Sequence, residues 1–561
     1  MLMKVVKRML RIFAWFLGIL LVIITAFLIY VLSIGDAQPP AVNAPDSVGI
    51  ELVRIDSTAA RIGNSWIRKN QFGLYEMYVE GTPFQRGLIN GKLSRELIVE
   101  QEAAFVQQIK QMVPSQGYLK FLRYITRFMN RGLPDHVTDE YKQEIYGISL
   151  SASDSFKWIG TNYERQLNYH AAHDIGHALQ NLMLVGCTSF SAWDAKTENG
   201  ALMLARNFDF WVGDAFAENK MVSFVRPSTG HPFAFITWGG FIGVVSGMND
   251  QGLTVTINAA KSRIPTNAAT PVSLVAREIL QYAGNIEEAI AIAQKRTMFV
   301  SESFLIGSAH DHRSVIIEKT PDNLAVYDAS SDHIICTNHY QSKQLKSQER
   351  NLEQMENSAS VYRYQRVQEL LQQNYPLTPQ RMADILRDHK GQNDKDIGVG
   401  NEKAVNQMIA HHSVIFMPDS LRMWVSTSPW QLGEFVCYDL RKIFAMKGLP
   451  QDVAVADTSL NIPPDTFLYT KAFEDFMQFR TLKMEWINSH HNMPLDPDLL
   501  VQLNPNYYEA YKIAGDYCLQ QGDYERAIRF YTSALHTEIA TKEERAAIEM
   551  QLQLARKAAR P

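Results

Sequence analysis

Apolar positions are unevenly distributed along the chain, and the first cluster of them is continuous. Residues 12–34 contain no charged side chain and follow a basic stretch with Lys4, Lys7, Arg8 and Arg11. As a helix this run would reach about 34 Å, enough to cross a ~30 Å hydrocarbon core. It is also longer than the roughly 7–15 apolar residues of a cleavable signal peptide. We therefore expect residues 1–35 to be an uncleaved, single-pass signal anchor, with a buried core helix as the alternative.

The basic flank predicts the orientation of this anchor. Lys and Arg are retained on the cytoplasmic side, so the rest of the chain is expected outside the cytoplasm, which is the periplasm if the source is a Gram-negative bacterium. Residues 36–48 are rich in Pro, Ala and Asn and indicate a linker. From 49 to 186 apolar residues recur at three- and four-residue spacing, most clearly at 97–112, 117–129 and 140–148. This spacing predicts a mainly helical leading segment.

At Cys187 the helical spacing gives way to short strand-like runs. TSFSAWDA and ALMLARNF flank the turn Asn199-Gly200, which predicts a hairpin. Further alternating runs continue to about residue 440, interrupted by helical spacing at 272–294. Many hairpin-linked strands with helical blocks predict an α+β domain with helices covering packed sheets, over residues 187–448.

A second boundary is expected at 449–465, which is rich in Pro, Asp and Ala. The tail, 466–561, has helical spacing, and one part of it fits the 34-residue tetratricopeptide pattern. The matching positions are Tyr511, Ala514, Gly515, Cys518, Ala527, Tyr531 and Ala534. We expect a small all-helical, tetratricopeptide-like region that could bind a protein partner.

Composition narrows the possible functions. The chain has 55 Lys and Arg against 59 Asp and Glu, a net charge of −4, which gives no electrostatic basis for binding nucleic acid. Its four cysteines are widely separated, so they predict no disulfide framework and no CxxC metal site. Any cysteine chemistry therefore depends on a single thiol.

The candidate chemistry lies at the start of the first hairpin. A hairpin returns the end of its second strand to the start of its first, which brings Arg206 and Asp209 back toward Cys187. A nearby guanidinium lowers the pKa of a thiol nucleophile and cannot itself deprotonate. Asp209 could hold a neighbouring amine or the arginine. The alternative is that Cys187 is a small buried hydrophobic residue.

These residues resemble a family, the N-terminal-nucleophile linear amide hydrolases, which include penicillin acyltransferase, N-acylethanolamine acid amidase and the bile-salt hydrolases. The resemblance extends in order from about residue 75 to 440, and its long leading segment is similar to the acyltransferase branch. Its motifs are Gly81-Thr82-Pro83-Phe84-Gln85-Arg86-Gly87, Cys187-Thr188-Ser189, Arg206-Asn207-Phe208-Asp209, Gly247-Met248-Asn249-Asp250-Gln251-Gly252-Leu253, Asn258, and Thr337-Asn338-His339.

The resemblance implies a four-layer αββα sandwich and a mechanism. Self-cleavage between Gly186 and Cys187 would free the α-amine of Cys187, the nucleophile, to act as local base. Asn258 and Asn338 would stabilise the oxyanion of a tetrahedral intermediate, while Arg206 and Asp209 would line the substrate end. The implied substrate is a small acyl amide, hydrolysed or used for acyl transfer, and no cofactor is expected.

Other features keep further interpretations open. Trp211, Trp238 and Phe241 could line an acyl pocket or could be core residues. His173 and His177 have the i, i+4 spacing of a zinc site, with Asp174 where a zincin has Glu, which would make the protein a zinc hydrolase. The pair His411-His412 begins a predicted strand and is more typical of an edge or a hydrogen-bonded core. A catalytically silent scaffold that binds a partner through its tail is the remaining alternative.

Overall fold

The structure is a computed structural model that describes residues 2–42, 51–113, 115–171, 174, 186–261, 268–449 and 454–560. Two β-sheets form its centre. Within the described residues, the larger has eleven strands in the order β1-β2-β3-β4-β7-β8-β9-β10-β11-β12-β13, and the smaller has six in the order β14-β5-β6-β15-β16-β17. All neighbouring strands pair antiparallel except β4 and β7, which are parallel.

The strands of the larger sheet are β1 (Val53–Arg54), β2 (Ala59–Ile62), β3 (Ser65–Lys69), β4 (Tyr75–Gly81), β7 (Met221–Pro227), β8 (Phe233–Thr237), β9 (Ser246–Asn249), β10 (Leu253–Ala259), β11 (Glu302–Ser308), β12 (Arg313–Lys319) and β13 (Leu324–Tyr327). Those of the smaller sheet are β5 (Thr188–Asp194), β6 (Gly200–Asp209), β14 (His333–Cys336), β15 (Ala410–Met417), β16 (Arg422–Ser426) and β17 (Phe435–Asp439).

The helices are α1 (Leu2–Ser33), α2 (Pro83–Leu93), α3 (Arg95–Met112), α4 (Gln116–Met129), α5 (Leu133–His136), α6 (Asp139–Ser149), α7 (Asn162–His170), α9 (Asp214–Glu218), α10 (Val272–Tyr282), α11 (Ile286–Lys295), α12 (Glu349–Asn357), α13 (Ser360–Asn374), α14 (Pro379–Leu386), α15 (Leu440–Ala445), α16 (Lys471–Asn488), α17 (Pro497–Leu503), α18 (Tyr508–Gln520), α19 (Tyr524–Leu535) and α20 (Lys542–Ala558). Short 3-10 turns occupy Asp154–Phe156, Gln392–Asp394, Pro418–Ser420, Thr458–Leu460 and Thr466–Tyr469.

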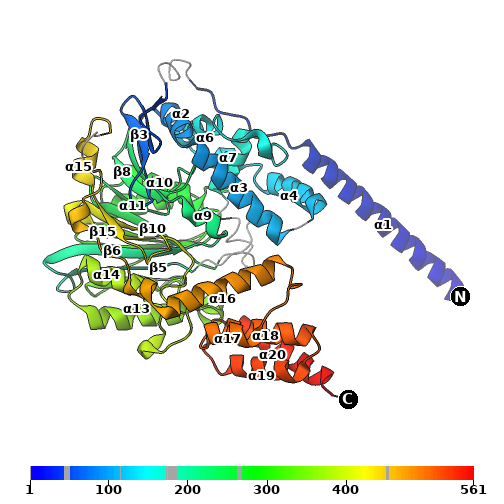
Figure 1. Ribbon diagram of the computed structural model, residues 1–561. Helices are drawn as coiled ribbons and strands as arrows, with labels where there is room; N and C mark the ends of the chain where they lie inside the picture. Colours follow the sequence, from blue (N-terminus) through cyan, green and yellow to red (C-terminus); the bar gives the residue numbers. More distant parts are fainter. Residues whose placement is uncertain are drawn as a thin grey trace.

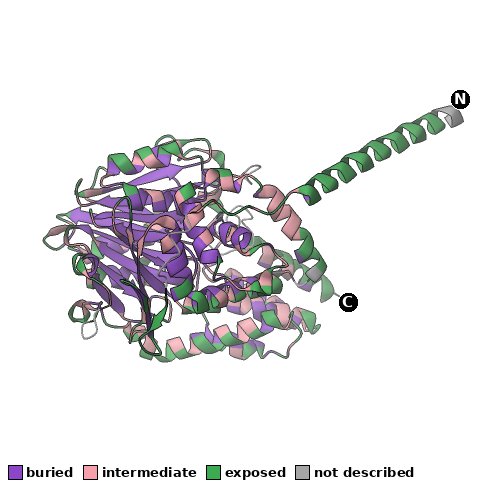
Figure 2. Cartoon of the chain, turned by 90° about the horizontal axis from the view of Figure 1, so that it is seen from above, coloured by how far each residue is buried: buried purple, intermediate pink, exposed green. Residues whose placement is uncertain are grey.

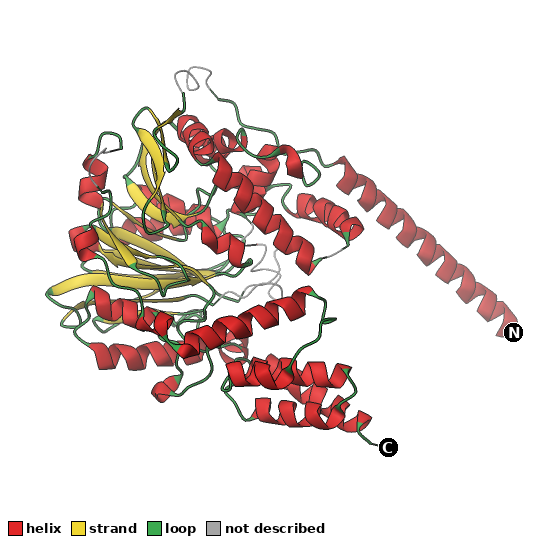
Figure 3. Cartoon of the chain, viewed as in Figure 1, coloured by secondary structure: helices red, strands yellow, loops and turns green. Residues whose placement is uncertain are grey.

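The two sheets stack face to face between two helical layers, so the molecule has the αββα order implied by the resemblance (Figures 1 and 3). Alternation along β15 explains the stacking, because successive side chains point to opposite faces of a sheet. Val414 and Phe416 lie in the core between the sheets, whereas Ile415 lies in the core under α13 and α14. The α+β fold predicted from the sequence is confirmed.

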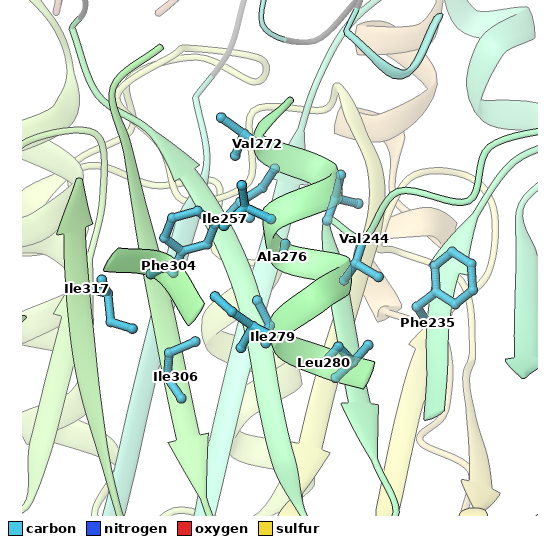
Figure 4. Close-up of a cluster of buried hydrophobic side chains, with 14 of the residues drawn as sticks. Phe235, Val244, Ile257, Val272, Ala276, Ile279, Leu280, Phe304, Ile306 and Ile317 are labelled. Carbon is cyan, nitrogen blue, oxygen red and sulfur yellow. The ribbon is translucent and has the colours of Figure 1, made fainter. Parts of the chain in front are cut away.

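Helices α10 and α11 cover the outer face of the larger sheet. Val272, Ala276 and Ile279 of α10 face Ile257 of β10 and Phe304 of β11 (Figure 4). Their three- and four-residue spacing is what places them on one face of the helix. The predicted helical block is interrupted at Ala283-Gly284, between α10 and α11.

The leading segment differs from the sequence-based expectation. Helices α3, α4 and α6 lie where predicted, but residues 53–81 form β1 to β4 instead of helix. These strands extend the larger sheet by pairing β4 with β7, residues far apart in the sequence. The leading segment is therefore part of the sandwich itself.

The two ends of the described chain are both helical. Helix α1 projects from the molecule, and almost all of its described side chains are exposed (Figure 2). Its segment Val6–Ser33 is long and apolar enough to cross a membrane. At the other end, α18 and α19 form a helical hairpin in which Gly515 packs against the Tyr531 ring, where a β-carbon would come within 2.6 Å of a ring atom. The tetratricopeptide assignment itself stays a prediction.

Candidate active site

Cys187 lies immediately before β5, at one end of the space between the sheets, and is 1% exposed. The hairpin register pairs Ser189 with Arg206 and Thr188 with Asn207. As predicted, this register returns Arg206 to the cysteine, and its Nη2 donates a hydrogen bond to Sγ over 3.2 Å. Positive φ angles of 60° at Asn199 and 71° at Gly200 form the predicted turn that sets the register.

Arg206 is fully buried and donates hydrogen bonds to several groups besides the thiol. Nη1 donates to the carbonyl of Val245 over 2.8 Å and Nη2 to that of Ile257 over 2.6 Å. Nη1 also donates to the hydroxyl of Ser246. Burial raises the pKa of the Cys187 thiol above its usual value, and the charge of Arg206 opposes this rise. The guanidinium is thus the group that favours the thiolate here.

The Gly186–Cys187 peptide bond lies in a cluster of hydrogen-bond donors. The Gly186 carbonyl accepts from Arg363 Nη1 and from Gln407 Nε2, each over 2.6 Å. Arg363 Nη1 also donates to the Cys187 carbonyl over 2.8 Å. A β-carbon at position 186 would lie 2.6 Å from Gln407 Nε2, so a larger residue here would displace the Gln407 amide from the carbonyl. Donors at this carbonyl oxygen are placed where negative charge would develop if the thiol attacked it.

Sequence reasoning missed both donors. Arg363 lies on α13 and Gln407 in the loop before β15, far from Cys187 in the sequence. Neither belongs to a motif with a recognisable spacing, and only the packing of α13 against the smaller sheet brings Arg363 to the cysteine.

Asp209 is fully buried near the Gly186–Cys187 bond. Its Oδ2 accepts from Gln407 Nε2 over 3.1 Å, and its backbone carbonyl accepts from the Gly186 N–H over 3.1 Å. Oδ1 has no hydrogen-bond partner in the described part of the chain. Burial raises the pKa of Asp209 to about 7, against the opposing charges of Arg363 and Arg206. The hydrogen bond to Gln407 connects this carboxyl group to the Gly186 carbonyl. The catalytic role of Asp209 stays a prediction.

Asn258 and Asn338 lie close to the cysteine strand, and both have structural partners. Asn258 accepts from the Ser189 hydroxyl over 2.6 Å and donates to the Cys336 carbonyl over 3.0 Å. Asn338 donates to the carbonyl of Ala259 over 2.9 Å and accepts from Arg363 Nη2 over 2.8 Å. In this structure the pair orients Arg363 and the strand ends. The predicted role in stabilising an oxyanion stays open.

A small cavity of about 50 Å³ lies beside an aromatic wall. Trp238 and Phe241 line it, stacked with centroids 4.3 Å apart, and His170 stacks on Phe241 at 4.9 Å. Cys187 belongs to the same buried cluster as both residues. Trp211, the third predicted pocket residue, is half-buried and does not line this cavity.

The cavity also has a polar end. Glu102 lines it, paired with Arg165 at 2.6 Å and accepting from the Tyr169 hydroxyl over 2.8 Å. This carboxylate has its charge and hydrogen bonds satisfied, so the aromatic wall gives the cavity its apolar character.

The zinc interpretation gains no support from the described residues. His173 and His177 lie outside them, and no group of three His, Cys, Asp or Glu suited to a metal ion occurs within them. His170 is buried, with Nδ1 against the Gln166 carbonyl at 2.7 Å and Nε2 accepting from the Ile242 N–H over 3.0 Å. Burial lowers the pKa of His170 to about 4, so this ring is neutral.

The buried thiol of Cys187, beside a guanidinium and the carbonyl of a preceding glycine, has the surroundings that the resemblance implies for it. Comparison with known families specifies this further. Residues 195–427 match the model of the acyl-coenzyme A:6-aminopenicillanic acid acyl-transferase family, which confirms the resemblance seen in the sequence. The matched region includes Arg206, Asp209, Asn258, Asn338 and Arg363 but begins after Cys187.

Two curated relatives each match slightly less than half of the chain. An uncharacterized protein of Archaeoglobus fulgidus is 23% identical over 276 residues, 45% of each chain. Protein dcd1A of Dictyostelium discoideum is 23% identical over 285 residues, 46% of this chain and 61% of its own. The chain thus spans about half the length of the curated relatives it matches.

Solved structures with similarity to this chain include amidases. The Caenorhabditis elegans ortholog of N-acylethanolamine-hydrolyzing acid amidase has 17% identity and a TM-score of 0.29, covering 42% of this chain and 93% of its own. Two variants of a conjugated bile acid hydrolase from Clostridium perfringens have 11% and 12% identity and TM-scores of 0.32, covering 45% and 46% of this chain and 93% of their own.

Proposed function

We propose that this protein is a membrane-anchored cysteine amide hydrolase or acyltransferase that activates itself by cleaving the Gly186–Cys187 bond. The observation that carries the proposal is the position of the Gly186 carbonyl. This carbonyl accepts hydrogen bonds from Arg363 and Gln407. It immediately precedes the buried Cys187, whose Sγ accepts a hydrogen bond from Arg206.

Self-cleavage would proceed by attack of Cys187 Sγ on the Gly186 carbonyl carbon. The new C–S bond forms as the C–N bond breaks, and the thiol proton ends on the released α-amine of Cys187. Arg363 and Gln407 stabilise the oxyanion on the Gly186 oxygen during this step. Water then hydrolyses the thioester and leaves residue 186 as a carboxylate.

The mature enzyme would act on an acyl amide by the same chemistry. The free α-amine, with an ordinary pKa near 8, takes the thiol proton as Sγ attacks the substrate carbonyl. Breaking the amide bond releases the substrate amine, protonated by the α-ammonium, and leaves an acyl thioester. Water completes hydrolysis, and a second amine completes acyl transfer.

The aromatic cavity supports an apolar acyl group as part of the substrate. Trp238 and Phe241 present stacked ring surfaces in the same buried cluster as Cys187. Such surfaces favour apolar groups by burying their area away from water. We therefore propose that the acyl group of the substrate extends from Cys187 toward this aromatic wall.

The length of α1 and its apolar, exposed surface support the proposal that this helix is a membrane anchor. The basic residues before it support an extracytoplasmic catalytic unit. Protease added to intact spheroplasts should then remove that unit and leave a membrane-bound stub. Complete protection would place it in the cytoplasm.

Intact-mass analysis of the purified chain tests the central step. The wild type should resolve into two chains divided between Gly186 and Cys187, and Cys187→Ala should remain one chain. Cys437→Ala is the matched control, because Cys437 is also buried in the smaller sheet but lies under α13 and α14. A single uncut chain for wild type would remove the N-terminal amine from the mechanism. Hydrolysis of a panel of N-acyl amides would show whether the cut chain is the active one.

A further inference from the structure

Two consecutive buried histidines occupy an irregularity in β15. Ala410 pairs with Asp209 and His412 with Phe208, so His411 is an extra residue on its strand, a β-bulge. In a regular strand, successive side chains would point to opposite faces. Bulges redirect side chains and are common beside active sites. Here the bulge lets His411 and His412 contact each other, with their Nδ1 atoms 2.9 Å apart.

The histidines continue a chain of hydrogen bonds that begins at the cysteine. Arg206 contacts Cys187 Sγ through Nη2 and the Ser246 hydroxyl through Nη1. The Ser246 hydroxyl lies 2.8 Å from His412 Nε2, and His412 is bonded to His411. All the side chains in this series of hydrogen bonds are buried, so water does not compete for them.

Because arginine can only donate, it determines which group donates in each hydrogen bond of this series. A guanidinium only donates, so Ser246 Oγ accepts from Arg206. No other acceptor for the Ser246 hydroxyl occurs in the described part of the chain, so its proton goes to His412 Nε2. A neutral His412 then carries its proton on Nδ1 and donates to His411 Nδ1. His411 in turn carries its proton on Nε2.

Burial and the charges around the pair keep both rings neutral. Burial, together with the positive charges of Lys220 and Arg206, lowers the pKa of His411 to about 3 and that of His412 well below its usual value. His411 Nε2 has no hydrogen-bond partner in the described structure. The ring lies edge-on to Trp238, with centroids 5.2 Å apart, and so reaches the aromatic wall.

We propose that Ser246, His412 and His411 are positioning residues, which hold the Arg206 guanidinium against the Cys187 thiol. The proposal rests on the proposed role of Cys187 as nucleophile. Two backbone carbonyls, one in β10 and one just before β9, accept hydrogen bonds from Arg206. The Ser246 hydroxyl is a third acceptor, and its own hydrogen bond to His412 orients it. Without His412 the Ser246 hydroxyl loses the acceptor that orients it, and Arg206 loses its alignment with Sγ.

A merely structural role predicts something different. Replacing a buried polar chain by apolar groups of similar shape is often neutral or stabilising. A structural pair could therefore be changed with no effect on chemistry, provided that the fold survives. A positioning role predicts slower chemistry in a fold of unchanged stability, and recovery when the acceptor is restored.

The test measures the rate of self-cleavage by intact mass after synthesis of the full chain. Ser246→Ala and His412→Phe should cleave at least tenfold more slowly than wild type, with unchanged melting temperatures. His412→Gln should recover most of the rate, because its Oε1 can accept from Ser246 near the position of Nε2. Ser314→Ala is the matched control, since Ser314 is a buried serine bonded to Ser191 at 2.7 Å between the sheets.

Wild-type rates in Ser246→Ala and His412→Phe would overturn the proposal. If the wild type itself does not cleave, the proposed self-cleavage fails, and the pH dependence of Cys187 alkylation by iodoacetamide on the uncut chains tests the positioning role instead. In that arm Ser246→Ala and His412→Phe should raise the apparent thiol pKa by about one unit, as a weakened Arg206 contact requires. No shift in either variant, with a shift in Arg206→Lys, would refute it.

Discussion

Arg363 is the residue that most directly connects the fold to the proposed chemistry. One guanidinium contacts the Gly186 and Cys187 carbonyls, the Thr188 hydroxyl and Asn338. Its planar fork can bridge several acceptors at once, which an ammonium group cannot reproduce. It is buried by the packing of α13 on the smaller sheet, so its position depends on the sandwich being assembled.

Removing this guanidinium should slow self-cleavage strongly. Arg363→Lys leaves Gln407 as the main donor to the Gly186 carbonyl, and losing one oxyanion donor typically costs about 10²–10³ in rate. The measurement is the intact-mass time course of the full chain. Arg381→Lys is the control, because Arg381 is exposed on α14 and donates only to nearby backbone carbonyls. An unchanged rate in Arg363→Lys would show that this carbonyl is stabilised elsewhere.

Asp209 offers a prediction that depends on pH. Its pKa of about 7 lies above the ~3.9 of an aspartate in an unfolded chain. Between about pH 4 and 7 the native state therefore binds more protons than the unfolded state, and stability falls as the pH rises through this window. In the uncut Cys187→Ala chain, the melting temperature should fall by several degrees from pH 4 to 8. Adding Asp209→Asn should reduce this fall, and equal pH profiles would contradict the assignment.

At the scale of elements, local signals predicted what short-range geometry determines. The β5–β6 hairpin follows from Asn199-Gly200, and α3, α4 and α6 follow from apolar spacing. Local signals did not predict the strands β1 to β4. The first strand, β1, has only two residues, and β4 pairs in parallel with β7, which lies far along the sequence. The bulge at His411 was missed for the same reason, since a bulge is defined only by the strand opposite.

Close packing of α2 on α6 yields a prediction for an element pair. A β-carbon at Gly87 would lie 2.0 Å from the Glu144 carbonyl oxygen, so Gly87→Ala must push the helices apart. The same contact orients Glu144, which pairs with Arg86 at 2.7 Å and with Arg277 of α10 at 3.2 Å. We expect a loss of at least about 1–3 kcal/mol, seen as a lower melting temperature.

A second glycine provides the control for this change. Within the residues that the structure describes, Gly117 of α4 has only the Ser115 hydroxyl, at 4.0 Å, near its β-carbon position. Gly117→Ala should be neutral or slightly stabilising, because alanine favours helix by about 1 kcal/mol over glycine. Equal melting temperatures for the two alanine variants would show that α2 and α6 can separate without cost.

At the scale of the whole molecule, the helical tail packs on the unit that contains the two sheets. Met408 and Leu432 of that unit share a buried cluster with Phe476 and Tyr507 of the tail. Asn504 exchanges two hydrogen bonds with the Val399 backbone, at 3.2 and 2.9 Å, and Glu538 pairs with Lys395 and Lys403. The segment 395–408 that receives these contacts also contains Gln407, the donor to the Gly186 carbonyl.

This arrangement predicts that the tail helps to hold Gln407 at the Gly186 carbonyl. Deleting residues 466–561 would expose the Met408 face and release the segment that carries Gln407, so self-cleavage should fall by tenfold or more. Because the deletion could also unfold the chain, Asn504→Ala provides the finer test: it removes both hydrogen bonds to Val399 and should slow cleavage several-fold while the fold persists. Asn488→Ala, at the exposed end of α16, is the matched control and should cleave like wild type. Intact-mass time courses and melting curves of the four chains decide the matter, since wild-type rates in both the deletion and Asn504→Ala would mean that Gln407 is held in place without the tail.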